Sequence, residues 1–161
     1  MTVDSAHQSR WAIGEVVFGI PFLISIALQF IAPFSLPPGM LRQALVPLGS
    51  VLILSGLGVI LLARREFAAH GQPTDPGHPT SEVIKTGVFA ISRNPLYLGS
   101  VLLLLGVGLA FNLLWTVGML LLSMILCQYI LIMPEERYLA AKFGDEYRTY
   151  MASVRRWLGR K

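Results

Sequence analysis

The sequence predicts an all-α integral membrane protein with about four transmembrane helices, a C-terminal helical hairpin and amphipathic tail helices. Of its 161 residues, 54% are hydrophobic and only 14% are charged, whereas a soluble domain carries about 25% charged residues. The mean hydropathy of +0.62 agrees with this class. We expect one membrane domain that comprises residues 1–161.

Four apolar runs define the expected spans. A helix needs roughly 20 residues to cross the hydrocarbon layer, so the 15 residues of the third run are short. The loop end of that run, with Arg93 and Tyr97, is therefore expected below the headgroups, where an arginine must be paired or face a wet cavity. The expected spans are residues 11–32, 44–63, 96–110 and 113–133.

The basic residues are distributed asymmetrically along these spans. Twelve of the 13 lie before the first run, in the 64–95 loop or in the 134–161 tail, and only Arg42 lies between the first two runs. The positive-inside rule places segments rich in Lys and Arg in the cytoplasm. We expect both termini and the 64–95 loop to be cytoplasmic.

The 64–95 loop has two parts. Residues 70–80 are dense in Pro and Gly and are expected to be irregular. In residues 81–95, Gly87 permits unusual backbone angles and Pro95 suits the first turn of the third helix. The backbone N–H groups at that helix start could receive an anionic group. A tight turn with Asn94 as N-cap explains the same residues equally well.

The tail predicts two short helices. An amphipathic stretch covers residues 135–143, Gly144 suits a helix end, and Asp145 is a candidate cap for a second helix. Apolar residues of that second helix recur every three or four positions, which also describes a helix lying in the membrane interface. They are Tyr147, Tyr150, Met151, Val154, Trp157 and Leu158.

Two adjacent carboxylates, Glu135 and Glu136, follow the fourth run directly. Because the 111–114 turn is short, the third and fourth helices must run antiparallel and side by side. Their loop ends then meet, and Arg93 could pair with the two carboxylates. We expect no metal site, because Cys127 is the single cysteine and the three histidines lack the spacing of metal ligands.

Two motifs stand out in residues 64–158. The first is Gly87-x-Phe89-x-x-x-Arg93-Asn94-Pro95-x-Tyr97-x-Gly99, and the second is Glu135-Glu136-x-x-Leu139-x-x-x-Phe143-Gly144-x-x-Tyr147-x-x-Tyr150-x-x-x-Val154-x-Arg156. In this order and with this gap, they resemble the isoprenylcysteine carboxyl methyltransferase family and its phospholipid methyltransferase relatives.

The resemblance implies an integral membrane methyltransferase that uses S-adenosylmethionine. It implies Glu135 and Arg93 as catalytic residues, with Arg93 neutralising a carboxylate of donor or acceptor. Tyr147, Arg148 and Tyr150 are the expected substrate contacts. The cofactor-binding residues implied are Thr86, Gly87, Val88, Phe89, Arg93, Asn94, Pro95, Tyr97, Leu98, Glu135 and Glu136.

The resemblance leaves the methyl acceptor open. An isoprenylcysteine-like carboxylate is favoured, although Ile132-Met133-Pro134 stands where family members often carry an arginine. A phospholipid amine is the alternative, and its proton would then pass to Glu135 or Glu136. An NADPH-dependent membrane reductase is a weaker alternative, since the chain has only four expected spans and no Gly-x-Gly-x-x-Gly motif. A non-enzymatic lipid-binding protein is another weaker alternative.

The expected partners are membrane lipids and a lipophilic or prenylated substrate. Nucleic acid is not expected, since no basic stripe with interleaved aromatic residues occurs. We expect the protein in a bacterial inner membrane. The sequence specifies no oligomeric state.

Overall fold

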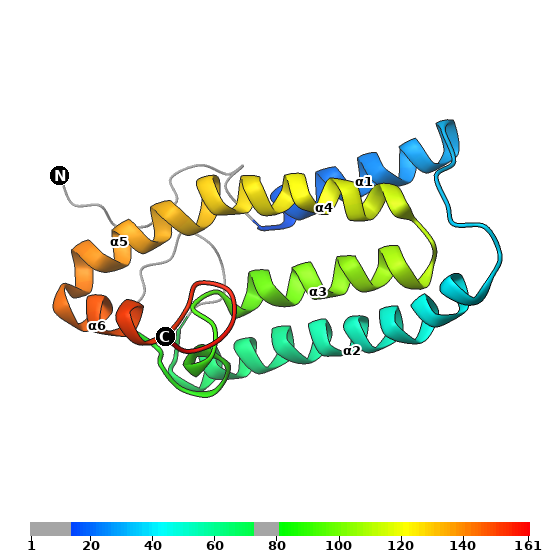
Figure 1. Ribbon diagram of the computed structural model, residues 1–161. Coiled ribbons are helices and arrows are strands. Elements are labelled where there is room, and N and C mark those ends of the chain that lie inside the picture. Colours follow the sequence, from blue (N-terminus) through cyan, green and yellow to red (C-terminus); the bar gives the residue numbers. More distant parts are fainter. Residues whose placement is uncertain (1–13, 73–80) are drawn as a thin grey trace.

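The computed structural model describes residues 14–72 and 81–161 and contains four long helical segments that run side by side (Figure 1). The first three are α1 (Gly14–Ile31), α2 (Met40–Ala69) and α3 (Pro95–Ala110). The fourth is continuous: α4 (Leu114–Leu126) passes through the π-helical segment η2 (Cys127–Ile132) into α5 (Met133–Phe143). A 3₁₀ turn, η1 (Gly87–Ala90), precedes α3, and α6 (Asp145–Ser153) follows α5.

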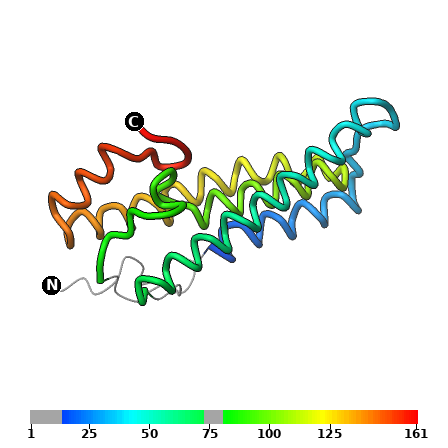
Figure 2. The backbone as a smooth tube through the Cα atoms, turned by 90° about the horizontal axis from the view of Figure 1, so that it is seen from below, coloured from blue at the N-terminus to red at the C-terminus, as the bar shows by residue number. Residues whose placement is uncertain are grey.

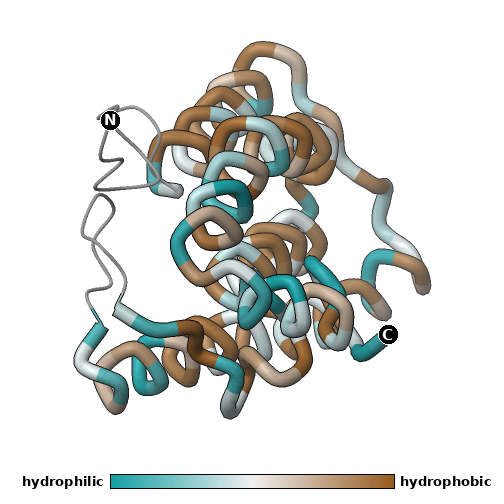
Figure 3. Tube along the Cα trace, turned by 90° about the vertical axis from the view of Figure 1, so that its left-hand side faces the viewer, coloured by the Kyte–Doolittle hydropathy of each residue, from teal (hydrophilic) through white to brown (hydrophobic). Residues whose placement is uncertain are grey.

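The lengths of these helices confirm the predicted all-α membrane class. α1, α2 and the continuous helix from Leu114 to Phe143 are each long and apolar enough to cross a membrane. α3 is shorter, since its 16 residues at about 1.5 Å each reach about 24 Å. Many large apolar side chains on the helices are exposed, such as Leu54 at 70%, and Figure 3 shows hydrophobic residues dominating the helices seen end-on.

Several polar segments gather at one end of the bundle, here called the tail end. It comprises residues 81–94, α5, α6 and the C-terminal residues 154–161, and Figure 1 shows it opposite the two short connections 32–39 and 111–113. The predicted common side for the 64–95 loop and the tail is thus reproduced. Their cytoplasmic location stays a prediction.

Two helices extend beyond their expected ends. α2 continues to Ala69 instead of ending at residue 63, and the fourth helix continues to Phe143 instead of ending at residue 133. Hydropathy marks where apolar residues stop, but no Gly or Pro interrupts residues 64–69, so the backbone has no reason to stop there. These extensions carry Phe67, Glu135 and Glu136 out of the apolar part of the bundle and into the tail end.

The most extensive helix contact is that of α2 against α3, and glycines make a close approach possible. A Cβ on Gly56 would lie 2.6 Å from the carbonyl oxygen of Gly99, and one on Gly106 would lie 2.6 Å from that of Gly49. Backbone therefore packs directly against backbone, as small residues allow in membranes. This contact fixes where the first turn of α3 lies relative to the last turns of α2.

The second pair, α1 and α4, is joined by a buried polar contact. The hydroxyl oxygens of Ser25 and Thr116 lie 2.9 Å apart, and both residues are almost completely buried. The same two helices and η2 contribute to an apolar core that includes Phe18, Leu120 and Leu131. Cys127 is fully buried in the same cluster, so its side chain packs in the core.

The π-helical segment η2 ends at Ile132, two residues before Pro134. Proline has no N–H, and its ring clashes with the carbonyl group four residues earlier, here that of Ile130. A wider turn relieves that clash while the helix continues, and such π-bulges are frequent at functional sites. The turn sets the direction in which Glu135 and Glu136 leave the fourth helix.

The tail departs from the prediction at both ends of α6. Gly144, with φ of 56°, stands at the N-cap position, and Asp145 is the first helical residue rather than the cap. The helix ends at Ser153, so Trp157 and Leu158 do not extend its apolar face. Residues 154–161 instead fold back, with Val154 bridged to Arg160, because residues 91–93 offer backbone partners to the tail.

Candidate active site

A cavity of about 450 Å³, including open solvent at its mouth, lies at the tail end. A second cavity adjoins it and shares Phe67, Phe89, Arg93 and Glu135. The first is also lined by Glu82, Val83, Ile84, Leu139, Tyr147 and Tyr150, and the second by Asn94, Pro95, Leu96 and Tyr97.

The segment that enters α3 brings Arg93 to these cavities. Pro95 begins the helix, as predicted. Asn94 occupies the N-cap position but makes no capping bond. Its side-chain nitrogen instead donates to the Arg156 carbonyl at 3.0 Å, and its backbone N–H donates to the Ser92 hydroxyl. The predicted N-cap role of Asn94 is therefore replaced by a tie to the tail.

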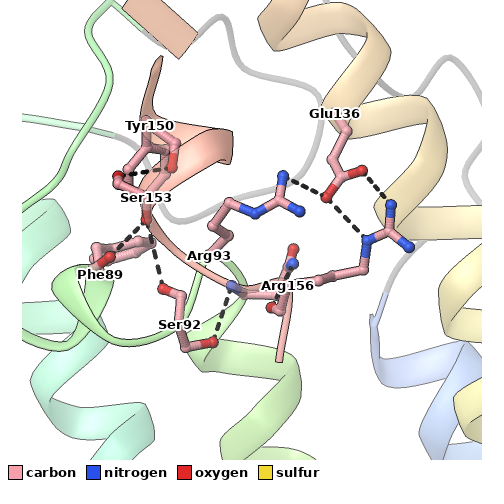
Figure 4. Close-up of polar contacts among 8 residues, drawn as sticks. Phe89, Ser92, Arg93, Glu136, Tyr150, Ser153 and Arg156 are labelled. Carbon is pink, nitrogen blue, oxygen red and sulfur yellow. Dashed lines mark hydrogen bonds and ion pairs between the residues drawn. The ribbon is translucent and has the colours of Figure 1, made fainter. Parts of the chain in front are cut away.

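Arg93 pairs with Glu136, across the hairpin as predicted. Its Nη1 lies 2.8 Å from Glu136 Oε1, and the two side chains are only 7% and 12% exposed. Arg156 joins the same carboxylate with two bonds, Nε to Oε1 at 3.0 Å and Nη2 to Oε2 at 2.6 Å. Figure 4 shows both guanidinium groups directed at Glu136 from different segments. We call these three residues the ion triad.

The ion triad leaves part of Arg93 without a partner. Its Nε donates no hydrogen bond to a described residue, and its Nη1 contacts Glu136 as an ion pair without forming a hydrogen bond. Two guanidinium groups and one carboxylate give the triad one net positive charge. A buried, incompletely paired guanidinium is costly unless a ligand completes it, so Arg93 is suited to bind an anionic group in the cavity.

Glu135 differs from its neighbour in its surroundings. It lines both cavities, forms no salt bridge with a described residue, and faces the hydroxyl group of Tyr97. The ring of Tyr97 is held by Phe18, with 6.4 Å between the ring centres. Of the two carboxylates, Glu136 is thus engaged in the ion triad, while Glu135 is available to a ligand.

Two tyrosines of α6 close the cavity on the side of the tail. Tyr147 is buried, and burial, together with the nearby Glu136, raises its pKa to about 12. It therefore stays neutral at physiological pH. Burial also raises the pKa of Tyr150, whose hydroxyl donates to the Phe89 carbonyl at 2.7 Å.

Tyr150→Phe tests the tie between α6 and the 3₁₀ turn. The change should destabilise the protein by about 1–3 kcal/mol, because it leaves the Phe89 carbonyl buried without a donor. The measurement is thermal unfolding in detergent. Tyr129→Phe is the matched control, since Tyr129 is 65% exposed; equal melting temperatures for both variants would contradict the prediction.

Several predicted contacts lie outside the cavity lining. The Thr86 hydroxyl donates to Glu66 at 2.6 Å, and Gly87, with φ of 53°, packs against the same glutamate. Val88 is part of a buried cluster with Ala63 and Phe89. Leu98 does not line either cavity. Their expected contacts with the cofactor stay predictions.

Arg148 lies on the surface. Its side chain is 68% exposed and pairs with Asp145 at 3.1 Å, so it does not join Tyr147 and Tyr150 at the cavity. Its expected contact with a substrate stays a prediction. Among the described residues, no group of three or more His, Cys, Asp or Glu side chains is placed to hold a metal ion.

Sequence reasoning missed several residues that line the cavities, among them Phe67. Phe67 lies beyond the expected end of the second span, and the unbroken helical composition up to Ala69 was the signal that could have found it. Arg156 pairs with Glu136 although the tail offers several arginines. Arg156 ends the second motif of the resemblance, but its pairing with Glu136 depends on how residues 154–161 fold back.

Fold and site together define a helical membrane protein with a polar, carboxylate-containing cavity at one end of its bundle. Residues 45–146 match the family described as phospholipid methyltransferase, and the chain belongs to this family of membrane methyltransferases. An uncharacterized protein of Haemophilus influenzae is 43% identical over 65 residues, which is 39% of this chain and all of that relative. No solved structure matches the chain significantly.

Proposed function

We propose that the protein transfers a methyl group from S-adenosylmethionine to the amine of a phospholipid headgroup. The observation that carries this proposal is the position of Glu135, a carboxylate that lines the cavities and has no salt-bridge partner among the described residues. Family membership supports the reaction class. The identities of the methyl donor and of the methyl acceptor go beyond the family match and belong to the proposal.

The lining residues fit the donor. Arg93 has an unpaired Nε for the carboxylate of the donor's amino-acid part, and the aromatic faces of Phe67, Phe89 and Tyr147 suit a cationic sulfonium and a flat purine. When bound, the donor supplies an electrophilic methyl group on a sulfonium and departs as a neutral thioether. The apolar side chains of Val83, Ile84 and Leu139 line the cavity and limit the access of water to that methyl group.

Glu135 favours an amine over a carboxylate acceptor. An ionised glutamate attracts a headgroup ammonium and repels a second carboxylate. The ammonium must lose a proton before its nitrogen lone pair can form the new N–C bond. The Glu135 carboxylate can take that proton, while the Tyr97 hydroxyl directs the side chain. An ammonium acceptor therefore gives Glu135 a function that a carboxylate acceptor does not need.

A second candidate is methylation of a carboxylate on an isoprenylcysteine-like lipid, as the sequence resemblance implies. The observation that favours it is Arg93, because an incompletely paired guanidinium group could hold the acceptor carboxylate instead of the donor's. Such an acceptor is already ionised and reacts without losing a proton. The two candidates thus differ in whether Glu135 is needed as a base.

The proposal is tested in two steps on detergent-purified protein. Calorimetric titration should show micromolar binding of S-adenosylhomocysteine and no displacement by NADPH; binding of NADPH alone, or of neither ligand, would refute the methyltransferase proposal. Radiolabelled methyl transfer in vesicles then compares phosphatidylethanolamine with a farnesylcysteine. We expect label in the phospholipid, and label only in the farnesylcysteine would establish the second candidate.

A further inference from the structure

Residues 154–161 are bonded to the stretch that carries Arg93. The backbone N–H of Arg93 donates to the Arg155 carbonyl at 3.1 Å, and that of Gly159 donates to the Ile91 carbonyl at 2.7 Å. Figure 2 shows this last segment lying against the segment that leads into α3. The tail is therefore part of the frame that holds Arg93, although the family match ends at residue 146.

The Arg156 side chain occupies both oxygens of Glu136 in a bidentate fork. Its hydrogen bonds to Glu136 raise the pKa of Arg156, so its positive charge persists. Bidentate arginine pairs fix orientation as well as charge. Arg93 consequently meets only one oxygen of that carboxylate and keeps its Nε unpaired.

We infer that Arg156 is a positioning residue that keeps Arg93 available for the carboxylate of the methyl donor. Without Arg156, both Glu136 oxygens would be free to engage Arg93 in a fork of its own. The charge of Arg93 would then be neutralised within the protein, and a bound carboxylate would lose its partner. This inference rests on the proposed function, because it assigns the donor's carboxylate to Arg93.

Two ligands, one with and one without an amino-acid carboxylate, distinguish the positioning role of Arg156 from a general effect on stability. S-adenosylhomocysteine carries the amino-acid carboxylate, whereas 5′-methylthioadenosine has the same adenosine thioether without it. In Arg156→Gln we expect binding of S-adenosylhomocysteine to weaken about tenfold and binding of methylthioadenosine to change less than about twofold, as the loss of one charge-assisted interaction predicts. Titration calorimetry of the full-length protein measures both.

Arg155→Gln is the matched control, because Arg155 is exposed and contributes through its backbone carbonyl. It should leave both affinities unchanged. If Arg156→Gln does not fold, Arg156→Lys keeps the charge without the fork and should shift the affinity ratio by about threefold. In an Arg93→Gln background, Arg156→Gln should cause no further change in the ratio, since its effect acts through Arg93.

Each result has a distinct meaning. A selective loss of S-adenosylhomocysteine binding that disappears in the Arg93→Gln background supports the inference. Equal weakening of both ligands, or no weakening of either, overturns it while the wild-type binding still upholds the proposed function. If the wild type binds neither ligand, the proposed function fails and the inference falls with it.

Discussion

Glu135→Gln should lower kcat for methylation of a lipid amine by about 100- to 10,000-fold, the usual contribution of a positioned base. Glutamine has nearly the same size and can still accept a hydrogen bond from Tyr97, so the cavity keeps its shape. It cannot take the proton that the acceptor ammonium must lose. The measurement is the initial rate of radiolabelled methyl transfer in vesicles at saturating donor and acceptor.

Binding of S-adenosylhomocysteine separates this chemical effect from damage to the site. We expect the dissociation constant of Glu135→Gln to stay within about tenfold of the wild-type value, since Arg93 and the aromatic residues remain in place. Glu146→Gln is the matched control, because Glu146 is 52% exposed and pairs with Lys85 at the surface. A Glu135→Gln variant that methylates at the wild-type rate would remove Glu135 from the mechanism.

The sequence predicted the membrane class and the helix order because both depend on hydropathy, which is a local property. It also predicted that Arg93 would meet the Glu135-Glu136 pair, since a short turn forces the two helices to run antiparallel. Which of the two glutamates pairs with Arg93 could not be predicted. Glu136 pairs with Arg93 and Glu135 faces Tyr97 because the π-helical turn before Pro134 sets their directions.

The structure of the C-terminal tail could not be predicted from local sequence patterns alone. Spacing of three and four residues from Tyr147 to Leu158 predicted a longer helix, but α6 ends at Ser153. The backbone groups of residues 91–93 pair with the tail, and no pattern within the tail itself contains that information. Arg156 owes its place in the ion triad to the same fold-back, so the motif that ends at Arg156 did not predict its pairing with Glu136.

Gly56→Leu should prevent the correct packing of α2 against α3. A Cβ at this position would lie 2.6 Å from both the Gly99 carbonyl oxygen and the backbone nitrogen of Leu103, and backbone cannot move aside as a side chain can. Overpacking of this kind costs about 3 kcal/mol or more, so we expect a melting temperature in detergent lower by about 10 °C. Phe67 on α2 would also shift relative to Arg93 at the start of α3.

Gly58→Leu is the matched control for Gly56→Leu. The two glycines lie on the same helix two positions apart, but a Cβ on Gly58 meets nothing within 4 Å. Both variants add the same side chain to the same apolar helix, and only one adds it between two backbones. Loss of S-adenosylhomocysteine binding in Gly56→Leu alone would show that α2 and α3 must touch for the cavity to form; equal stability and binding in both variants would mean that the close glycine contact does not position the site.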